Sequence, residues 1–203
     1  MPPRRLLFAA CVIGVLTLTA AVRSDETTPA PATTARLTFR LTDTTGVVHT
    51  ERELAQAPAV ILFFIAPDCP ISQGYVPEMN RIALSYAGRG VRVFGVQSDP
   101  AASDAAVRQH VADYKYAFPV LSDRRQQLVA HAGATVTPET VLMTRTGKLL
   151  YQGRIDNRVV SLGVRKPHAT QFDLRSAIDA ALAGRVSSFT RTTAIGCTIV
   201  RTP

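Results

Sequence analysis

The chain has 203 residues and a formal net charge of +8 at pH 7, and 46% of its residues are hydrophobic. This length fits one domain with a sizeable core, together with extensions at the termini. No dense Lys or Arg cluster accompanies the positive charge, so the composition does not indicate a nucleic-acid-binding protein.

The first 24 residues have the layout of a secretory signal peptide, with Met-Pro-Pro-Arg-Arg before about fifteen mostly apolar residues. We therefore expect export to the periplasm or another extracytoplasmic compartment. The apolar run is shorter than the about 20 residues of a membrane span, although an uncleaved anchor and lipid attachment at Cys11 are alternatives. Cleavage after Ser24 would remove three arginines, lower the formal charge to +5 and leave two cysteines, Cys69 and Cys197.

The remaining chain divides into a linker, one domain and a tail. Residues 25–35 are rich in Thr, Pro and Ala, which predicts a flexible linker. Residues 36–185 alternate between strand and helix patterns and form the predicted domain, whereas residues 186–203 lack a helical period and are expected to be an extended tail.

Within the domain, residues 37–41 and 47–50 flank an Asp-Thr-Thr-Gly turn, which predicts an N-terminal β-hairpin. The continuously apolar residues 59–65 indicate a central strand that is covered on both faces. This order predicts an α/β fold in which helices flank both faces of a mixed sheet. The other expected elements are strands at 91–97 and 118–121, a final hairpin formed by residues 132–143 and 148–155, helices at 70–86, 103–115, 123–131 and 170–182, and a basic loop at 157–168.

Cys69 is the main candidate for a reactive group, because it lies where the central strand ends and a helix begins, with Pro70 at the first helical position. Unpaired N–H groups and the helix dipole favour a negative charge there. They should lower the pKa of a partly exposed thiol and stabilise its thiolate. A buried, inert cysteine is the alternative.

These residues resemble a known family over positions 36–185. Phe-Phe-Ile-Ala-Pro-Asp-Cys-Pro-Ile-Ser is similar to the active-site segment of thioredoxin-like proteins, and the N-terminal extension resembles the redoxin branch that includes alkyl hydroperoxide reductase and thiol-specific antioxidant proteins. The resemblance implies a thioredoxin-like fold with Cys69 as nucleophile. It also implies that Pro138 is a cis-proline and that Thr137 and Pro70 contact the substrate.

The chain departs from the family pattern at two places. Ser72 replaces the second cysteine, so the short disulfide of thioredoxins cannot form, although the Ser72 hydroxyl is a candidate donor to the thiolate. The peroxiredoxin pattern also fails, because Leu62 and Ala66 stand at its proline and hydroxyl positions. An efficient peroxidase is therefore not expected, and weak thiol peroxidase activity remains an alternative.

Cys197 in the tail is the second candidate catalytic residue. The segment from Gly184 to Cys197 can span at most about 43–47 Å, which exceeds the roughly 38 Å diameter of such a domain. Cys197 can therefore reach Cys69 and act as a resolving thiol, with Gly196 allowing a close approach. A permanent disulfide, an unpaired thiol and pairing with another molecule are alternatives.

We thus expect an exported thiol-disulfide oxidoreductase that acts on protein disulfides, small thiols or peroxides and needs no cofactor. The alternative from another functional class is a carrier that binds copper or zinc through Cys69, Cys197 and His168. The four histidines have no ligand spacing, and most are expected at the surface. Asp156 is expected in a turn.

Overall fold

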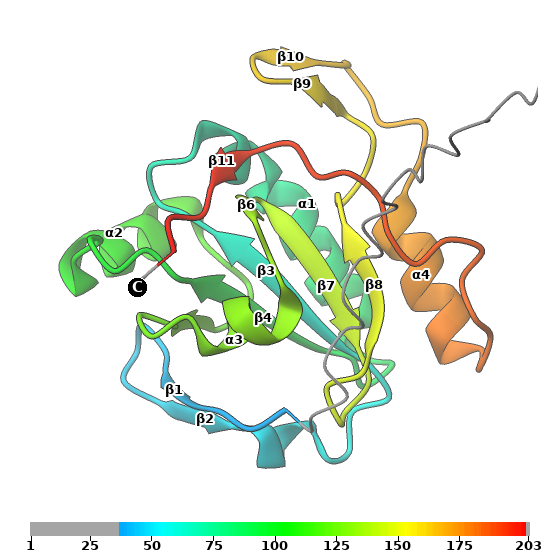
Figure 1. The fold of residues 1–203 in the computed structure, drawn as a ribbon, viewed down its shortest axis with the longest axis horizontal. Helices are drawn as coiled ribbons and strands as arrows, with labels where there is room; N and C mark the ends of the chain where they lie inside the picture. Colours follow the sequence, from blue (N-terminus) through cyan, green and yellow to red (C-terminus); the bar gives the residue numbers. More distant parts are fainter. Residues whose placement is uncertain (1–36, 202–203) are drawn as a thin grey trace, which may run out of the picture. The chain divides into compact units, whose positions relative to one another are not determined.

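The structure is a computed structural model that describes residues 37–201, so the predicted signal peptide, Cys11 and the linker lie outside the described residues. A five-stranded mixed sheet of order β5-β4-β3-β7-β8 forms the centre (Figure 1). β3, β4 and β5 are parallel to one another, and β7 is antiparallel to both β3 and β8. The bounds of these strands are β3 Val60–Ile65, β4 Arg92–Gln97, β5 Val120–Ser122, β7 Glu139–Met143 and β8 Leu149–Gly153.

The remaining elements surround the sheet or form small two-stranded pairs. The helices are the 3-10 helix η1 Glu51–Leu54, α1 Pro70–Ala87, α2 Asp104–Tyr114, α3 Gln127–Ala132 and α4 Asp173–Leu182. The short strands are β1 Arg40–Thr42, β2 Val48–Thr50, β6 Val136–Thr137, β9 Val159–Ser161, β10 Val164–Arg165 and β11 Cys197–Thr198. None of the helices in residues 37–201 is long and apolar enough to cross a bilayer.

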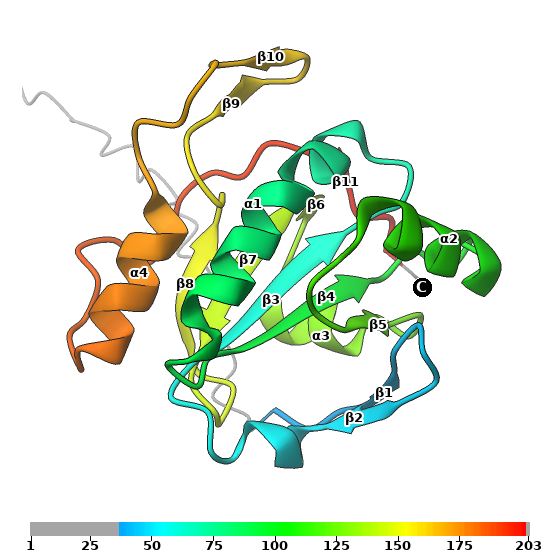
Figure 2. The ribbon, with the colours of Figure 1, turned by 180° about the vertical axis from the view of Figure 1, so that it is seen from behind.

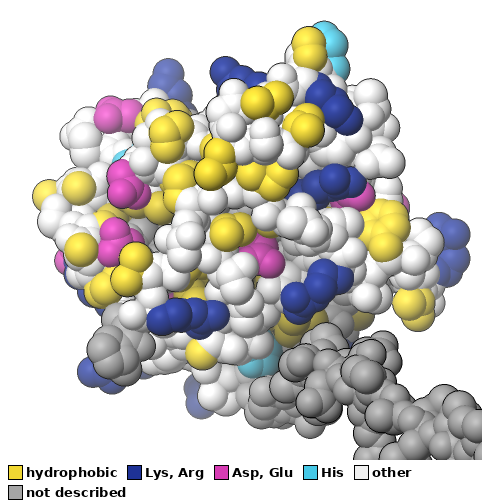
Figure 3. All heavy atoms as spheres, turned by 45° about the horizontal axis from the view of Figure 1, so that its top comes forward, with side chains coloured by type: hydrophobic (Ala, Val, Ile, Leu, Met, Phe, Trp, Pro, Cys, Tyr) yellow, Lys and Arg dark blue, Asp and Glu magenta, His cyan; other side chains and the backbone are white. Residues whose placement is uncertain are grey.

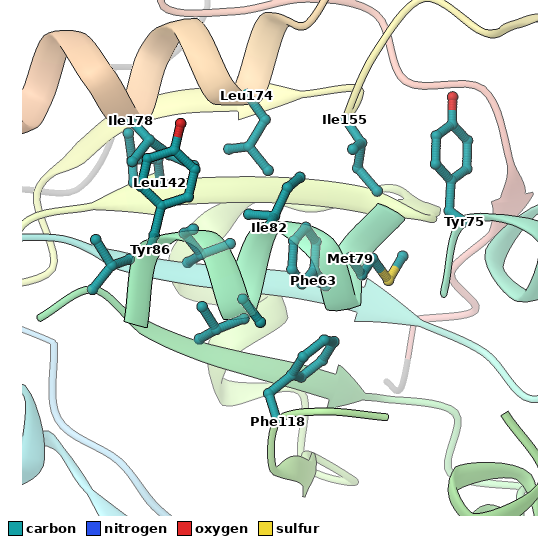
Figure 4. Packing of buried hydrophobic residues seen from close by; sticks show 14 of the residues in the cluster. Phe63, Tyr75, Met79, Ile82, Tyr86, Phe118, Leu142, Ile155, Leu174 and Ile178 are labelled. Carbon is teal, nitrogen blue, oxygen red and sulfur yellow. The ribbon is translucent and has the colours of Figure 1, made fainter. Parts of the chain in front are cut away.

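β3 divides the interior into two hydrophobic clusters because its successive side chains point to opposite faces of the sheet. Ile61 and Phe63 pack with apolar residues of α1 and α4, and Figure 4 shows Phe63 beside Met79 and Ile82. Leu62 and Phe64 pack in the second cluster, with residues of α3 and β1. Figures 1 and 2 show these helices on opposite faces of the sheet, which explains the uninterrupted apolar run of β3.

Local capping determines where α2 and α3 begin. Ser103 caps α2, and its hydroxyl accepts a hydrogen bond of 3.2 Å from the N–H of Ala106. Asp123 is fully buried and its carboxylate accepts hydrogen bonds from the first three N–H groups of α3. Because Asp123 caps α3 from a distance, α3 starts four residues later than the sequence pattern predicts.

Three expectations about the segment after β8 and about the histidines are wrong. Residues 157–168 contain the antiparallel strands β9 and β10, where a loop was expected. Asp156 is buried and accepts a hydrogen bond of 2.7 Å from the hydroxyl of Tyr75, so it is more than a turn residue. His49 and His110 are buried; His49 lies between two carboxylates, those of Asp43 and Glu53.

Candidate active site

Cys69 is the residue that caps the N-terminus of α1. Its backbone is extended, with φ −90° and ψ 108°, and Pro70 begins the helix. The Cys69 carbonyl accepts a hydrogen bond of 3.0 Å from the N–H of Gln73, which forms the first turn of α1. The predicted position of the thiol at the end of a buried strand and the start of a helix is therefore confirmed.

β6 brings a second segment to the sulfur of Cys69. The Thr137–Pro138 peptide bond is cis, as predicted, and the Thr137 carbonyl oxygen lies 3.0 Å from the Cys69 sulfur. The backbone of Thr137 is already paired in this structure, with Cys197 of β11 in an antiparallel register. The C-terminal tail therefore brings the Cys197 thiol to Cys69. Figure 1 shows β11 of the tail beside β6.

Gly196 makes the close approach of the tail possible. A Cβ atom at this position would lie 2.6 Å from the Thr137 carbonyl carbon and 3.1 Å from the Pro138 nitrogen, and would overlap the Thr137 carbonyl oxygen. Only a residue without a side chain fits against this peptide bond. The sequence-based expectation that Gly196 permits a close contact at Cys197 is confirmed.

The environments of the two thiols move their pKa values in opposite directions. Burial opposes ionisation of Cys69, but hydrogen bonds from the Cys197 thiol, the Ser72 backbone N–H and the Thr137 hydroxyl outweigh it and lower the pKa of Cys69. Burial, the hydrogen bond to Cys69 and the negative charges of Cys69 and Asp68 raise the pKa of Cys197 to about 12. These opposite shifts make Cys69 the more acidic of the two thiols, and the Cys197 thiol donates a hydrogen bond that favours the Cys69 thiolate.

Removing the Cys197 thiol should raise the pKa of Cys69. In the reduced protein, thiolate absorbance in the ultraviolet should titrate at Cys69 with a midpoint below the about 8.5 of an ordinary thiol. Cys197→Ala should move this midpoint upward, because the main favourable hydrogen bond is lost. The midpoint in Cys197→Ser, whose hydroxyl can still donate a hydrogen bond, should lie between those of the unaltered protein and Cys197→Ala. Equal midpoints in all three proteins would show that Cys197 does not stabilise the thiolate.

Two features of the site differ from the sequence-based expectation. Cys69 is not partly exposed: only 1% of its surface is accessible, in a site that the tail closes. Ser72 is fully buried and its hydroxyl has no hydrogen-bond partner among the described residues. The backbone N–H of Ser72, and not its hydroxyl, is the Ser72 group that helps to lower the pKa of Cys69.

Sequence reasoning missed the residues that hold the tail in place. The side-chain amide of Gln126 donates to the Val200 carbonyl at 2.6 Å, and Arg201 donates to the Ala134 carbonyl at 2.8 Å. Ile199 is buried in the second hydrophobic cluster. Further upstream, Phe189 makes an edge contact with Tyr151. No periodic pattern in the tail indicates these contacts, because they are made one at a time with distant parts of the chain.

The metal-carrier alternative is not supported by this geometry. Residues 37–201 contain no group of three His, Cys, Asp or Glu side chains that is placed to hold a metal ion. His168 is exposed in the segment between β10 and α4, and it does not join the two cysteines in a ligand set.

Comparison with known proteins gives a family match that spans the residues around Cys69. The model of the AhpC/TSA family matches residues 29–152, which include Cys69, Thr137 and Pro138 but not Cys197. Among curated proteins, the chain is 28% identical over 114 residues to "Thiol-disulfide oxidoreductase ResA" of Bacillus thuringiensis strain Al Hakam and of Bacillus anthracis. The match covers 56% of this chain and 64% of the length of each relative.

Similar solved structures extend over more of the chain. The hypothetical protein SMc02350 from Sinorhizobium meliloti 1021 is 31% identical, with a TM-score of 0.70 over 81% of this chain and 92% of that protein. An uncharacterised conserved protein from Geobacillus kaustophilus is 26% identical, with a TM-score of 0.73 over 85% of this chain and 93% of that protein. A putative thiol:disulfide interchange protein DsbE from Chlorobium tepidum is 26% identical, with a TM-score of 0.58 over 73% and 95%. The predicted thioredoxin-like fold is thus confirmed.

Proposed function

Because the chain belongs to the AhpC/TSA family, we propose that it is a thiol-disulfide oxidoreductase in which Cys69 is the nucleophile and Cys197 the resolving thiol. The observation that carries this proposal is the pairing of β11 with β6, which holds Cys197 within hydrogen-bond reach of Cys69. The name of the Bacillus relatives supports the same reaction class.

The first step would be attack of the Cys69 thiolate on one sulfur of a substrate disulfide. A bond forms between the Cys69 sulfur and that substrate sulfur, and the other substrate sulfur leaves as a thiolate. Since Cys69 is 1% exposed, the tail must move aside before a disulfide larger than a small molecule can reach it. When the tail moves, the hydrogen bond from Cys197 is lost, but the Ser72 backbone N–H at the start of α1 still favours the Cys69 thiolate.

The second step would be attack of Cys197 on the Cys69 sulfur of the mixed disulfide. Cys69 is then uncharged, so its charge no longer raises the pKa of Cys197, and the departing substrate thiolate can accept the Cys197 proton. The Cys69–Cys197 disulfide forms and the second substrate thiolate leaves, which reduces one substrate disulfide and oxidises the protein by two electrons. With thiols in excess, the same steps run in reverse.

Peroxide is a poorer fit as the substrate. The peroxiredoxin pattern has a hydroxyl residue where this chain has Ala66. It has a proline where this chain has Leu62, which is buried in β3. The Ser72 hydroxyl is buried beside the site, but the described contacts do not include one with the Cys69 sulfur. We therefore propose disulfides of proteins or small molecules as the substrates.

Mass spectrometry of the oxidised protein tests the proposed pairing. Reduced protein is treated with one equivalent of hydroxyethyl disulfide, free thiols are alkylated, and the digest is searched for linked peptides. We expect one intramolecular bond between Cys69 and Cys197 that glutathione can reduce. Alkylation of both cysteines after the oxidant is consumed, or a bond between two chains, would contradict the resolving role. A bond that glutathione never reduces would show a structural bridge.

We also propose that the protein works outside the cytoplasm. The support is the signal-peptide layout of residues 1–24 and the use of cysteines as a potential disulfide pair. In such a compartment the electron donor or acceptor would be another thiol protein or a small thiol. Sequencing the N-terminus of the exported protein would identify the cleavage site, which we expect after Ser24.

A further inference from the structure

A groove lies at the start of α1, between the first turns of this helix and the β9–β10 hairpin. Its volume is about 280 Å³, and Pro70, the residue after Cys69, is part of its wall. The hairpin projects from the body of the domain above the N-terminus of α1 (Figures 1 and 2). Anything held in this groove is therefore next to the start of the helix that Cys69 caps.

The groove and the hairpin present apolar side chains to solvent. Ile71 and Val159 line the groove. On the hairpin, the exposed fractions of Val160, Leu162 and Val164 are 50%, 69% and 54%. Figure 3 looks onto this end of the molecule and shows hydrophobic side chains lying beside basic ones. Exposed apolar side chains that cluster on one projecting element are typical of a surface that binds a partner.

The two charged residues that line the groove, Arg158 and Arg165, are both basic, and the nearby Asp156 carboxylate is buried against Tyr75. Residues 157–172 include Arg158, Arg165 and Lys166 but no Asp or Glu. Arg158 lies over the ring of Tyr75 at 4.7 Å and donates a hydrogen bond of 2.8 Å to the Gly74 carbonyl. A Cβ at Gly74 would lie 3.4 Å from a guanidinium nitrogen of Arg165. Among the ion pairs of residues 37–201, none includes either arginine.

We propose that this groove binds an extended segment of a partner protein next to the partner's reactive cysteine, with an apolar side chain in the groove and an acidic side chain at Arg158 and Arg165. This inference rests on the proposed function and adds the substrate class, a polypeptide disulfide flanked by apolar and acidic residues. The acidic side chain of the partner is inferred from its charge complementarity to Arg158 and Arg165. The groove is concave and its wall includes Pro70, the residue after Cys69, which fits a peptide segment better than a membrane surface.

Paired peptide disulfides test the preference. The probes are the symmetrical disulfides of the peptides acetyl-Ala-Cys-Leu-Glu-Glu-amide and acetyl-Ala-Cys-Leu-Lys-Lys-amide, and hydroxyethyl disulfide serves as the neutral reference. At low ionic strength, the reduced protein should react about fivefold or more faster with the acidic peptide than with the basic one, and salt should diminish this ratio. Replacing Leu by Ser in the acidic peptide should slow its reaction.

Two charge-reversed variants locate the effect. Arg165→Glu should abolish or invert the ratio of acidic to basic peptide rates. Arg185→Glu makes the same change of net charge at an exposed arginine after α4 and should keep the ratio. Equal rates for both peptides with the unaltered protein, or the same loss of the ratio in both variants, would overturn the inference.

Two further outcomes would also overturn it. Sedimentation of the protein with phosphatidylglycerol vesicles, combined with equal peptide rates, would assign the hairpin to a membrane surface. Failure to reduce any of the disulfides, hydroxyethyl disulfide included, would refute the proposed function itself. Normal reduction of hydroxyethyl disulfide without a peptide preference would refute only the assignment of the groove.

Discussion

Cys69→Ser is expected to lower the rate of disulfide reduction by at least about a thousandfold, because a serine hydroxyl is not ionised near neutral pH and cannot form the mixed disulfide. Cys197→Ser should behave differently. It keeps the Cys69 thiolate, so its single-turnover reaction with hydroxyethyl disulfide should stay within about tenfold of the unaltered protein. The reaction should then stop at the mixed disulfide on Cys69, which mass spectrometry identifies.

The two variants are compared in a chain in which Cys11 is also replaced by Ser, so that each sample contains only the thiols of interest. Stopped-flow measurement of thiol loss gives the first step, and glutathione-coupled turnover gives the full cycle. Full turnover by Cys197→Ser would remove Cys197 from the mechanism. An adduct on Cys197 together with normal rates in Cys69→Ser would show that the roles of the two cysteines are the reverse of those proposed.

Gly196→Ala is expected to release the tail from the active site. The added methyl would overlap the Thr137 carbonyl, and overpacking of this kind costs about 1–3 kcal/mol. The fraction of molecules with an open tail should rise about 5-fold to 150-fold, since each 1.4 kcal/mol corresponds to a factor of ten. Labelling of Cys69 by a bulky maleimide should accelerate by this factor, whereas closure of the Cys69–Cys197 disulfide should slow.

Gly88→Ala is the matched control for this substitution. It adds the same methyl group at the end of α1, where no heavy atom lies within 4 Å of the added Cβ, and the backbone φ is −64°. Cys69 labelling in Gly88→Ala should equal that of the unaltered protein. If Gly196→Ala also labels at this rate, the tail does not control access to Cys69.

Periodic patterns in the sequence predicted most of the sheet and its helices correctly. The spacing of apolar residues in α1 and the unbroken apolar run of β3 are local signals, and both elements are found within one residue of their predicted bounds. The start of α3 was missed because its cap, Asp123, acts from four residues away. The β9–β10 hairpin was missed because exposed valines on a projecting element give no alternation of buried and exposed residues.

The candidate site was predicted only in part, because some of its residues depend on contacts with distant parts of the chain. Cys69, Pro70 and the cis-proline at Pro138 follow from local sequence and family resemblance. The burial of Cys69 does not follow from local sequence, because the segment that encloses the site is the C-terminal tail. Gln126, which holds the tail at Val200, has no distinguishing sequence neighbours, and only the folded structure shows its role.

The route of the tail links redox state to the lifetime of the protein. A bond between Cys69 and Cys197 would close a ring that contains the whole central sheet except β3, and such a ring would stabilise the fold by about 4–5 kcal/mol in the chain-entropy model. In the reduced protein, the described residues 197–201 are held by a few hydrogen bonds and one buried isoleucine. Carboxypeptidases should therefore trim the reduced form past Cys197 and remove the resolving thiol, whereas in the oxidised form the disulfide should retain Cys197 on the protein.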